Sequence, residues 1–440
     1  MTAGGRRVTA YAKLTVVSTA PVKPGKAYPL SVLDHAMERH SLHIVFYYRP
    51  GPALDRDRLK ESMSELLTFF PATTGRLCRE GEGGKRWVVK CNDAGVRVVD
   101  ARADATVDEW IATATAAEER ELVYWEPMGA DPSIWSPFYV QITEFKDKGY
   151  AIGLSCTHMH ADPTCAVLLF KAWADCHRRA CIVNPPFFHP PALLPRPIPN
   201  PSAHLLSLKS SSSSSSAAAA AAAFPMFSAT FRFTSAAVRS LVADLSPDFP
   251  DATPFDALTA LFWLAVARAR ASSPAAAALT LVTDFRKRMY APLPYGFYGN
   301  AAHFSRVEAD LSEGWARAAA AVGRHVAGLE EEEYWSAIEW LAARRDGGAG
   351  AFQMYGPELT CVKLDHVMAY DAEMAEGVGP AHVSCWVGGP DVDGVVVVLP
   401  AEDSAARTVV VVLPAEIAMK VCRDEEILRR GPTVIFSGKI

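Results

Sequence analysis

The spacing of apolar and polar residues changes between two periods along the chain, which predicts a protein of mixed strands and helices. Residues 8–17 and 42–48 are rich in β-branched and aromatic side chains, as strands are. Residues 55–70 repeat with the helical period instead, and their apolar side chains share one face: Leu59, Met63, Leu66, Leu67 and Phe70. Pro71 ends this predicted helix because proline cannot continue it. Single helices are also predicted over residues 107–122 and 415–429.

Residues 150–174 combine both periods within one short stretch. The apolar run 151–156 predicts a buried strand, and His158-Met-His-Ala-Asp162 follows it directly. An apolar helical pattern begins after Pro163. Residues 138–145 alternate in polarity and are expected to pair with the strand as a hairpin. We therefore expect a strand, a polar turn and a helix, an arrangement that holds a side chain between rigid elements.

The polar turn carries the main candidate for catalysis. His158 follows the predicted strand, and a neutral imidazole there can take a proton from an alcohol or amine that attacks a carbonyl. Asp162, four residues on, would brace the turn by pairing with a distant arginine. The same pattern also fits a strand-end histidine and a helix-capping aspartate, so both interpretations stay open. His160 is expected to point to the other side as a structural residue.

The composition changes in the middle of the chain. Residues 185–201 are rich in proline and precede seven serines, 210–216, and seven alanines, 217–223, which is typical of a linker. Thr253-Pro-Phe-Asp256 then predicts a helix start, with threonine as N-cap and proline at the first helical position. We predict three parts, which are an N-terminal domain over 1–184, a linker over 185–226 and a C-terminal domain over 227–440.

Length and composition narrow the class of protein. A chain of 440 residues exceeds one compact core, so two domains are expected. The net charge is −5 and no long basic stripe occurs, which argues against nucleic-acid binding. The nine cysteines include no C-x-x-C pair, so we expect free thiols in a reducing compartment. No secretory signal, membrane span or metal site is predicted, since no long apolar run and no second cluster of ligand residues occurs.

Several blocks besides the His158–Asp162 turn carry a resemblance to a known family. They are Pro29-Leu-Ser-Val-Leu-Asp34, Phe70-Pro-Ala-Thr-Thr-Gly-Arg76-Leu77, Cys91-Asn-Asp-Ala-Gly95-Val96, Val140-Gln-Ile-Thr-Glu-Phe145, Phe255-Asp-Ala-Leu-Thr-Ala-Leu-Phe-Trp263, and the segment from Pro292-Leu-Pro to Tyr298-Gly-Asn300. Over nearly its whole length the chain resembles the plant BAHD-type, or HxxxD, acyltransferases.

The resemblance implies an α/β fold of two similar-sized domains, each a mixed β-sheet flanked by helices, with a channel between them, as in chloramphenicol acetyltransferase. His158 would be the general base in that channel. Acyl-CoA would be a substrate, and no bound cofactor is implied. Asp162 would point away and form a structural ion pair with Arg286, with Arg288 as the alternative. Breaking such a pair costs on the order of 3–5 kcal/mol if it is buried.

The second motif of the family, D-F-G-W-G, is degenerate in this sequence. Residues 371–379 occupy its place, with Glu373 standing for the aspartate and Gly377 for the last glycine. The residues between them are replaced by Met374, Ala375 and Glu376. A charged side chain where the family buries a tryptophan is expected to change the packing of this loop.

A kept HxxxD with a lost second motif is shared with one subgroup, the Eceriferum/Glossy wax-biosynthesis proteins. Further matches to this subgroup are Leu33-Asp-His-Ala-Met37, Arg97-Val-Val-Asp100, Ser133-Ile-Trp-Ser-Pro137 and Tyr355-Gly-Pro-Glu-Leu359. The subgroup resemblance implies a protein that promotes elongation of very-long-chain fatty acyl-CoAs for cuticular wax, with a β-ketoacyl-CoA synthase as partner. The alternative is an acyl-CoA-dependent acyltransferase that moves an acyl group to an alcohol or amine, with His158 as general base.

The location that the resemblance implies is cytoplasmic, at the endoplasmic reticulum through the partner, and a nuclear location is left open. By itself the protein is expected to be a monomer.

Overall fold

The structure is a computed structural model that describes residues 7–23, 25–52, 54–81, 84, 86–188, 205–207, 209, 225–271, 277–289, 293–346, 352–356, 358–389 and 394–440. Pro292 and most of the predicted linker, residues 189–204, 208 and 210–224, lie outside the described residues. The chain divides into two compact units. The first contains residues 1–190, 294–300 and 368–388, and the second contains 191–293, 301–367 and 389–440. Each unit has its own large sheet, so the predicted α/β fold with two sheet-containing domains is confirmed.

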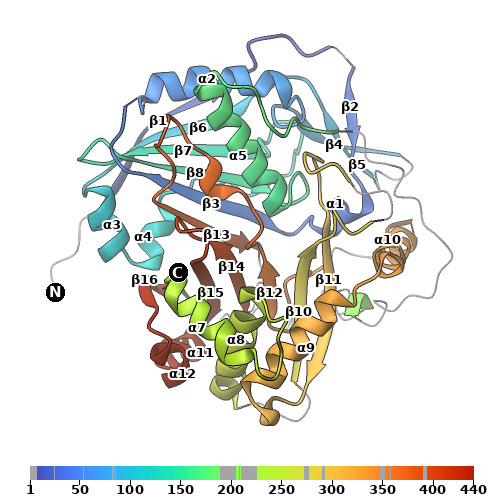
Figure 1. Cartoon of the computed structure of the whole chain (residues 1–440). Helices are drawn as coiled ribbons and strands as arrows, with labels where there is room; N and C mark the ends of the chain where they lie inside the picture. The colour runs from blue at the N-terminus through green and yellow to red at the C-terminus, as the bar shows by residue number, and fades with distance from the viewer. Residues whose placement is uncertain are drawn as a thin grey trace. The chain divides into compact units, whose positions relative to one another are not determined.

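A mixed six-stranded sheet forms the centre of the first unit, in the order β1-β6-β7-β8-β3-β13 (Figure 1). Its strands are β1 (Val8–Val16), β3 (Ser41–Tyr48), β6 (Val96–Ala103), β7 (Phe138–Glu144), β8 (Tyr150–Thr157) and β13 (His382–Gly388). Only β6 and β7 are parallel neighbours. The predicted hairpin is confirmed, because β7 and β8 pair antiparallel with Val140 opposite Leu154.

A smaller sheet and several helices complete the first unit. The small sheet has the order β2-β5-β4, with β2 (Ala27–Pro29), β4 (Arg76–Glu80) and β5 (Arg86–Lys90). The helices are α1 (Val32–Ala36), α2 (Arg56–Phe69), α3 (Val107–Thr113), α4 (Ala116–Arg120), α5 (Pro163–His177) and the 3-10 turn η5 (Ala369–Asp371).

Helices α2 and α5 lie side by side over one face of the six-stranded sheet (Figure 1). All of α5 is buried, and Phe170 stacks on Phe46 of β3 with ring centroids 3.6 Å apart. The indole Nε1 of Trp173 donates to the carbonyl oxygen of Leu59 at 3.2 Å and to Ser62 Oγ at 3.0 Å. Each such buried large apolar side chain contributes about 1.5–3 kcal/mol. The end of β8, which precedes α5, is therefore anchored in a packed core.

The second unit is built on a seven-stranded sheet in the order β11-β10-β12-β14-β15-β9-β16. Its strands are β9 (Met226–Phe233), β10 (Ala277–Asp284), β11 (Ala302–Ala309), β12 (Thr360–Lys363), β14 (Val395–Pro400), β15 (Arg407–Pro414) and β16 (Thr433–Lys439). Its helices are α7 (Ser235–Leu245), α8 (Pro254–Arg270), η4 (Leu311–Glu313), α9 (Trp315–Ala327), α10 (Glu331–Asp346), α11 (Ala415–Val421) and α12 (Glu425–Arg429).

Helix α8 is the buried centre of the second unit. It begins as predicted, because Thr253 and Asp256 form a reciprocal capping box and Pro254 occupies the first turn. Phe262 packs edge-on against Phe231 of β9, with ring centroids 5.1 Å apart. Most of the helix is apolar around its whole circumference, as expected of a helix buried on all sides.

Two predicted helices are divided in the structure. Residues 107–122, predicted as one helix, form α3 and α4, because Thr115 accepts a hydrogen bond from Glu118 N–H and starts a new helix with its own capping box. Residues 415–429 likewise form α11 and α12, since Asp424 caps a second helix start. The prediction also missed β16, an edge strand with a bulge in its pairing to β9. Among the described residues, no helix has both the length and the apolar character needed to span a membrane.

A buried polar cluster lies where β3 and β13 pair in the first unit. The register places His382 opposite Tyr47, and Ser384 two residues further along β13. Glu119 of α4 is fully buried beside them and accepts hydrogen bonds from Ser384 Oγ at 2.5 Å and Tyr47 Oη at 3.2 Å. Burial raises the pKa of Glu119 to about 7, although Ser384 and Tyr47 act in the opposite direction. The ionised form of Glu119 is therefore a cost to the folded state near neutral pH.

We predict that Glu119 makes the folded state less stable as the pH rises. The folded-state pKa of Glu119 lies above the ordinary value of 4.5, so its contribution is complete below pH 4.5 and is lost as the pH rises through about 7. Glu119→Gln keeps the shape and should remove up to about 3 kcal/mol of pH dependence between pH 4.5 and 8. Urea unfolding across this range measures it. Glu61→Gln, at an exposed glutamate of α2 in the same unit, is the control, and equal pH dependence in the wild type and Glu119→Gln would contradict the prediction.

Candidate functional site

His158 lies directly after β8, in a turn that the ends of two neighbouring strands hold. Its backbone N–H donates to the carbonyl oxygen of His40 at 2.9 Å, just before β3 begins. The N–H of His160 donates back to the carbonyl oxygen of Thr157 at 3.0 Å and closes the turn. The side chain of His158 is fully buried. The predicted position of this imidazole at the end of a buried strand is therefore confirmed.

Asn300 and Asp34 hold the other side of the same turn. The side-chain Nδ2 of Asn300 donates to the carbonyl oxygen of His158 at 2.7 Å and to Asp34 Oδ1 at 2.8 Å. The backbone N–H of Asn300 also donates to Asp34 Oδ1, at 2.9 Å. The second oxygen of Asp34 accepts from the backbone N–H of Ser31 at 2.7 Å, within a capping box that starts α1. All of these residues belong to the first unit.

Asp162 is the N-cap of α5. Its Oδ1 accepts a hydrogen bond from the backbone N–H of Cys165 at 2.8 Å, and Pro163 occupies the first turn of the helix. Asp162 is buried, so it supplies an acceptor for a helix-end N–H group that water cannot reach. The helix-capping interpretation of this residue is therefore correct, and capping leaves its second oxygen for another partner.

Burial lowers the pKa of His158, so the imidazole is neutral at physiological pH. Asp162 and the side chain of Asn300 act in the opposite direction and favour the protonated ring. A neutral imidazole whose protonated form is favoured by neighbouring groups is suited to accept a proton. The environment of His158 therefore fits the chemistry that the sequence predicts for it.

His160 has different surroundings from His158. Its ring lies edge-on against Phe138, with centroids 5.4 Å apart. Burial, followed by the positive charge of Arg76, lowers the pKa of His160 to about 3. This buried, neutral ring packs against β7, which agrees with the structural role predicted for it.

The predicted arginine partners of Asp162 lie in the second unit, so their pairing with it stays a prediction. Arg286 is fully buried, and its Nη1 lies 2.8 Å from Asp284 Oδ2. Its backbone N–H donates to the other carboxylate oxygen of Asp284, also at 2.8 Å. Burial alone would raise the pKa of Asp284, but Arg286 and His366 hold it well below its usual range. Arg288, the alternative partner, follows on the same turn.

Residues 371–379, the place of the degenerate second motif, form a tight hairpin turn in the first unit. Met374 N–H donates to the carbonyl oxygen of Val378 at 3.0 Å, and Val378 N–H donates to that of Ala375 at 2.9 Å. Met374 is fully buried, whereas Glu376 at the tip is exposed. Gly377 has a φ of +71°, which glycine adopts without strain.

The base of this turn is tied to the sheet. Tyr48 Oη donates to the carbonyl oxygen of Ala372 at 2.7 Å. Glu373, which the sequence predicts to stand for the family's aspartate, lies 3.8 Å from Arg178 in a partly exposed ion pair, which is worth about 1 kcal/mol or less. A methionine thus anchors the turn in the core, and the charge of Glu376 remains in solvent.

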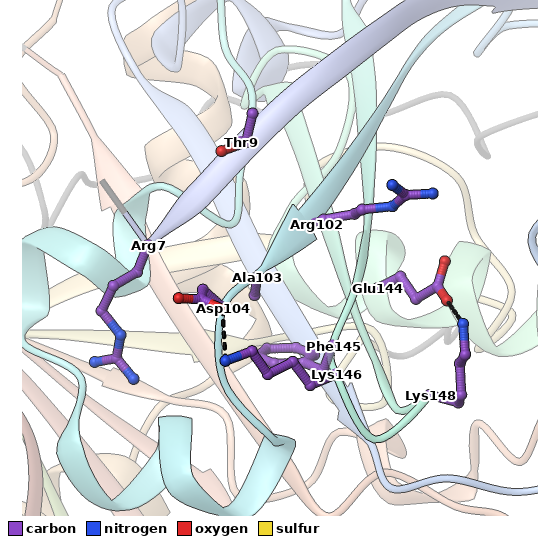
Figure 2. Close-up of a pocket in the computed structure, with 9 residues that line it drawn as sticks. All are labelled: Arg7, Thr9, Arg102, Ala103, Asp104, Glu144, Phe145, Lys146 and Lys148. Atoms are coloured by element: carbon purple, nitrogen blue, oxygen red, sulfur yellow. Dashed lines mark hydrogen bonds and ion pairs between the residues drawn. The ribbon is translucent and has the colours of Figure 1, made fainter. Parts of the chain in front are cut away.

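Hollows elsewhere in the first unit do not involve these residues. A surface depression of about 540 Å³ lies near the start of β1 (Figure 2). The residues that line it include two ion pairs, Lys146 with Asp104 and Lys148 with Glu144, each at 2.6 Å. A second cavity, between α2, α5 and the sheet, has only about 30 Å³ of space, too little for an acyl chain. Neither hollow is lined by His158, Asp162 or residues 371–379.

Sequence reasoning did not identify Asp34 and Asn300 as site residues, although both lie in blocks that carry the family resemblance. Their separation of 266 residues gives no spacing signal that would connect them. Within the described ranges, no cluster of three or more His, Cys, Asp or Glu side chains is arranged to hold a metal ion.

The chain is similar over most of its length to proteins of one family. The sequence model of the Transferase family matches residues 6–427. Protein ECERIFERUM 26-like of Arabidopsis thaliana is 29% identical over 416 residues, which cover 92% of this chain and 92% of that protein. A hydroxycinnamoyltransferase of Narcissus pseudonarcissus is 27% identical over 438 residues, covering 92% of this chain and 98% of that protein.

Two solved structures share the fold. Vinorine synthase matches with a TM-score of 0.70 and 20% identity, covering 96% of this chain and 98% of its own. TRI101 of F. sporotrichioides, solved with coenzyme A and T-2, matches with a TM-score of 0.72 and 15% identity, covering 92% of this chain and 99% of its own.

A double-mutant cycle tests the partner of Asp162. We expect Arg286→Ala to lower the free energy of unfolding by about 3–5 kcal/mol, because it leaves the carboxylates of Asp284 and Asp162 without the arginine. Asp162→Asn should cost less, since Arg286 keeps Asp284, and the double variant should cost little more than Arg286→Ala alone. Asparagine caps a helix as well as aspartate does, so loss of the cap cannot explain the effect of Asp162→Asn. Arg288→Ala is the matched control, and an Asp162→Asn variant as stable as the wild type would leave capping as the role of Asp162.

Proposed function

The chain belongs to the Transferase family, the BAHD-type acyltransferases, and we propose that within it the protein promotes elongation of very-long-chain fatty acyl-CoAs for cuticular wax. The observation that carries this proposal is the turn at residues 371–379. The rest of the scaffold keeps the family's elements, but this segment replaces the second motif with a short turn anchored by Met374. The similarity to ECERIFERUM 26-like and ECERIFERUM 26 of Arabidopsis thaliana, both at 29% identity, supports it.

In this proposal the protein binds acyl-CoA or its acyl chain and presents it to a β-ketoacyl-CoA synthase, which forms the carbon–carbon bond. Such a role uses the fold for binding and needs no proton transfer by His158. Association with the synthase would also place the protein at the endoplasmic reticulum. A change of product length without new chemistry requires only that longer chains bind the complex better than shorter ones, since about 1.4 kcal/mol changes a preference tenfold.

A second candidate function is acyl transfer from acyl-CoA to an alcohol or amine. The observation that favours it is the neutral, buried imidazole of His158, with Asp162 and Asn300 favouring its protonated form. His158 would take the proton of the acceptor as its oxygen or nitrogen attacks the thioester carbonyl, and would return it to the leaving thiolate. The similarity to a hydroxycinnamoyltransferase of Narcissus pseudonarcissus, at 27% identity, supports this candidate.

Co-expression tests the elongation function. Together with a β-ketoacyl-CoA synthase in a host that lacks both proteins, this chain should shift the acyl products toward greater length. His158→Ala should keep most of the shift, because presentation of the chain does not need the imidazole. Gas chromatography of the extracted acyl chains measures the distribution. The synthase expressed alone is the control, and the same product lengths with and without this chain would contradict the proposal.

A purified-protein assay tests the transfer function. With an acyl-CoA and a long-chain alcohol or amine, the wild type should release free thiol from CoA. His158→Ala should reduce the rate on the order of 10²–10⁴-fold, the usual contribution of a general base. A thiol reagent follows the release. His160→Ala, which alters the neighbouring core ring, is the control for indirect damage, and no release across a broad acceptor panel would contradict this candidate.

A further inference from the structure

We propose that Asn300 is a positioning residue for His158 and that Asp34 fixes the orientation of its side chain. The proposal deepens the second candidate function, because it concerns the residue that would act as base there. It stands on the hydrogen bonds of the turn after β8, all of which lie within the first unit. In this assignment Asp162 caps the helix, and Asn300 holds the histidine.

The partners of the Asn300 amide determine its orientation. A side-chain amide has two N–H donors on nitrogen and an acceptor on oxygen, and only its partners show which end is which. Both oxygens of Asp34 already accept backbone N–H groups, Oδ1 from Asn300 and Oδ2 from Ser31, so the nitrogen of the Asn300 side chain faces Oδ1 as a further donor. The second N–H of that nitrogen then points to the carbonyl oxygen of His158. Both donors are used, and a flipped amide would lose both bonds.

These hydrogen bonds fix the backbone of His158. Its backbone N–H donates to His40, and its carbonyl oxygen accepts from Asn300, so the peptide groups on both sides of its Cα are held. The imidazole keeps only its side-chain torsions as free variables, and burial restricts those too. Holding a reacting group in place in this way reduces the entropy lost on reaching the transition state.

Asn300 is itself held by Asp34 and by the backbone conformation of the preceding glycine. Its backbone N–H donates to the same oxygen of Asp34 that its side chain contacts. The preceding Gly299 has a φ of +139°, a conformation that other residues rarely adopt. A Cβ at that position would lie 3.1 Å from Phe297 Cζ. Glycine therefore allows the backbone turn that brings both nitrogen atoms of Asn300 to one carboxylate oxygen.

Asn300 also affects the protonation of the His158 ring. Burial lowers the pKa of His158, and the Asn300 side chain opposes this, as a group that favours the imidazolium does. Asp162 acts in the same direction. Asn300 would therefore stabilise the ring after it has taken a proton, in addition to fixing its place.

The ring nitrogens of His158 provide a direct test, because their ¹⁵N chemical shifts report the tautomer and the protonation state without any substrate. In the wild type we expect one set of shifts, typical of a single neutral tautomer. In Asn300→Ala these shifts should move or broaden while the melting temperature shows a folded protein. Spectra of His158→Gln assign the signals among the twelve histidines. Asn92→Ala, at an exposed asparagine of the same unit, is the matched control and should leave the shifts unchanged.

Unchanged His158 shifts in a folded Asn300→Ala protein would overturn the proposal. If that variant does not fold, Asn300→Ser retains one donor toward Asp34 and is measured in the same way. Failure of both to fold would also overturn it, because Asn300 would then be a residue of general stability. If CoA release is measurable, kcat should fall at least about tenfold in Asn300→Ala with KM little changed. Altered shifts without CoA release in the wild type would support positioning while contradicting the transfer function.

Discussion

A single buried carboxylate organises the turn that carries the histidine of the H-x-x-x-D motif. Asp34 accepts the backbone N–H of Ser31, the N-cap of the short helix α1, and accepts two hydrogen bonds from Asn300. A carboxylate buried without such donors would be costly, so its three short contacts are a condition for its presence in the core. Because Asn300 continues to the carbonyl of His158, the position of that residue depends on an interaction that the motif itself does not contain.

This arrangement separates two roles that the motif joins in sequence. Asp162 satisfies the start of α5, which is a local task determined by residues three positions apart. His158 is held by residues far away in the chain, and its neutral, buried ring results from packing of the whole unit. The motif could therefore persist in a protein that no longer catalyses transfer, because capping of α5 alone is a reason to keep its aspartate.

Much of the fold followed from local patterns. The hairpin of β7 and β8, the capping box at Thr253 and the family assignment all rest on signals within short stretches. The sequence also contains the capping residues Thr115 and Glu118 that start a new helix at α4. They were not recognised as a helix start because the helical apolar pattern continues across them. Edge strand β16 was missed because its exposed, bulged sequence has little of the apolar alternation that marks a buried strand.

Less of the site than of the fold could be predicted from the sequence, because its contacts join residues that are far apart in the chain. The location of His158 after a strand is a local property and was predicted, whereas its contacts with Asn300 arise from tertiary packing. The sequence predicts that Glu376 changes the packing of the loop but does not show how: the turn places that residue at an exposed tip and buries Met374 instead. Side-chain identity alone does not reveal which residue of a rebuilt turn faces inward.

The membership of β13 in the first sheet affects how the protein is made. Residues 382–388 pair with β3, more than 300 positions earlier, so the sheet lacks its last strand until nearly nine-tenths of the chain has left the ribosome. Until then β3 exposes an open edge of backbone N–H and C=O groups, which invites pairing with other chains. The sheet of the first unit therefore stays incomplete while most of the second unit is synthesised. A fragment that ends before β13 would keep the open edge of β3 permanently.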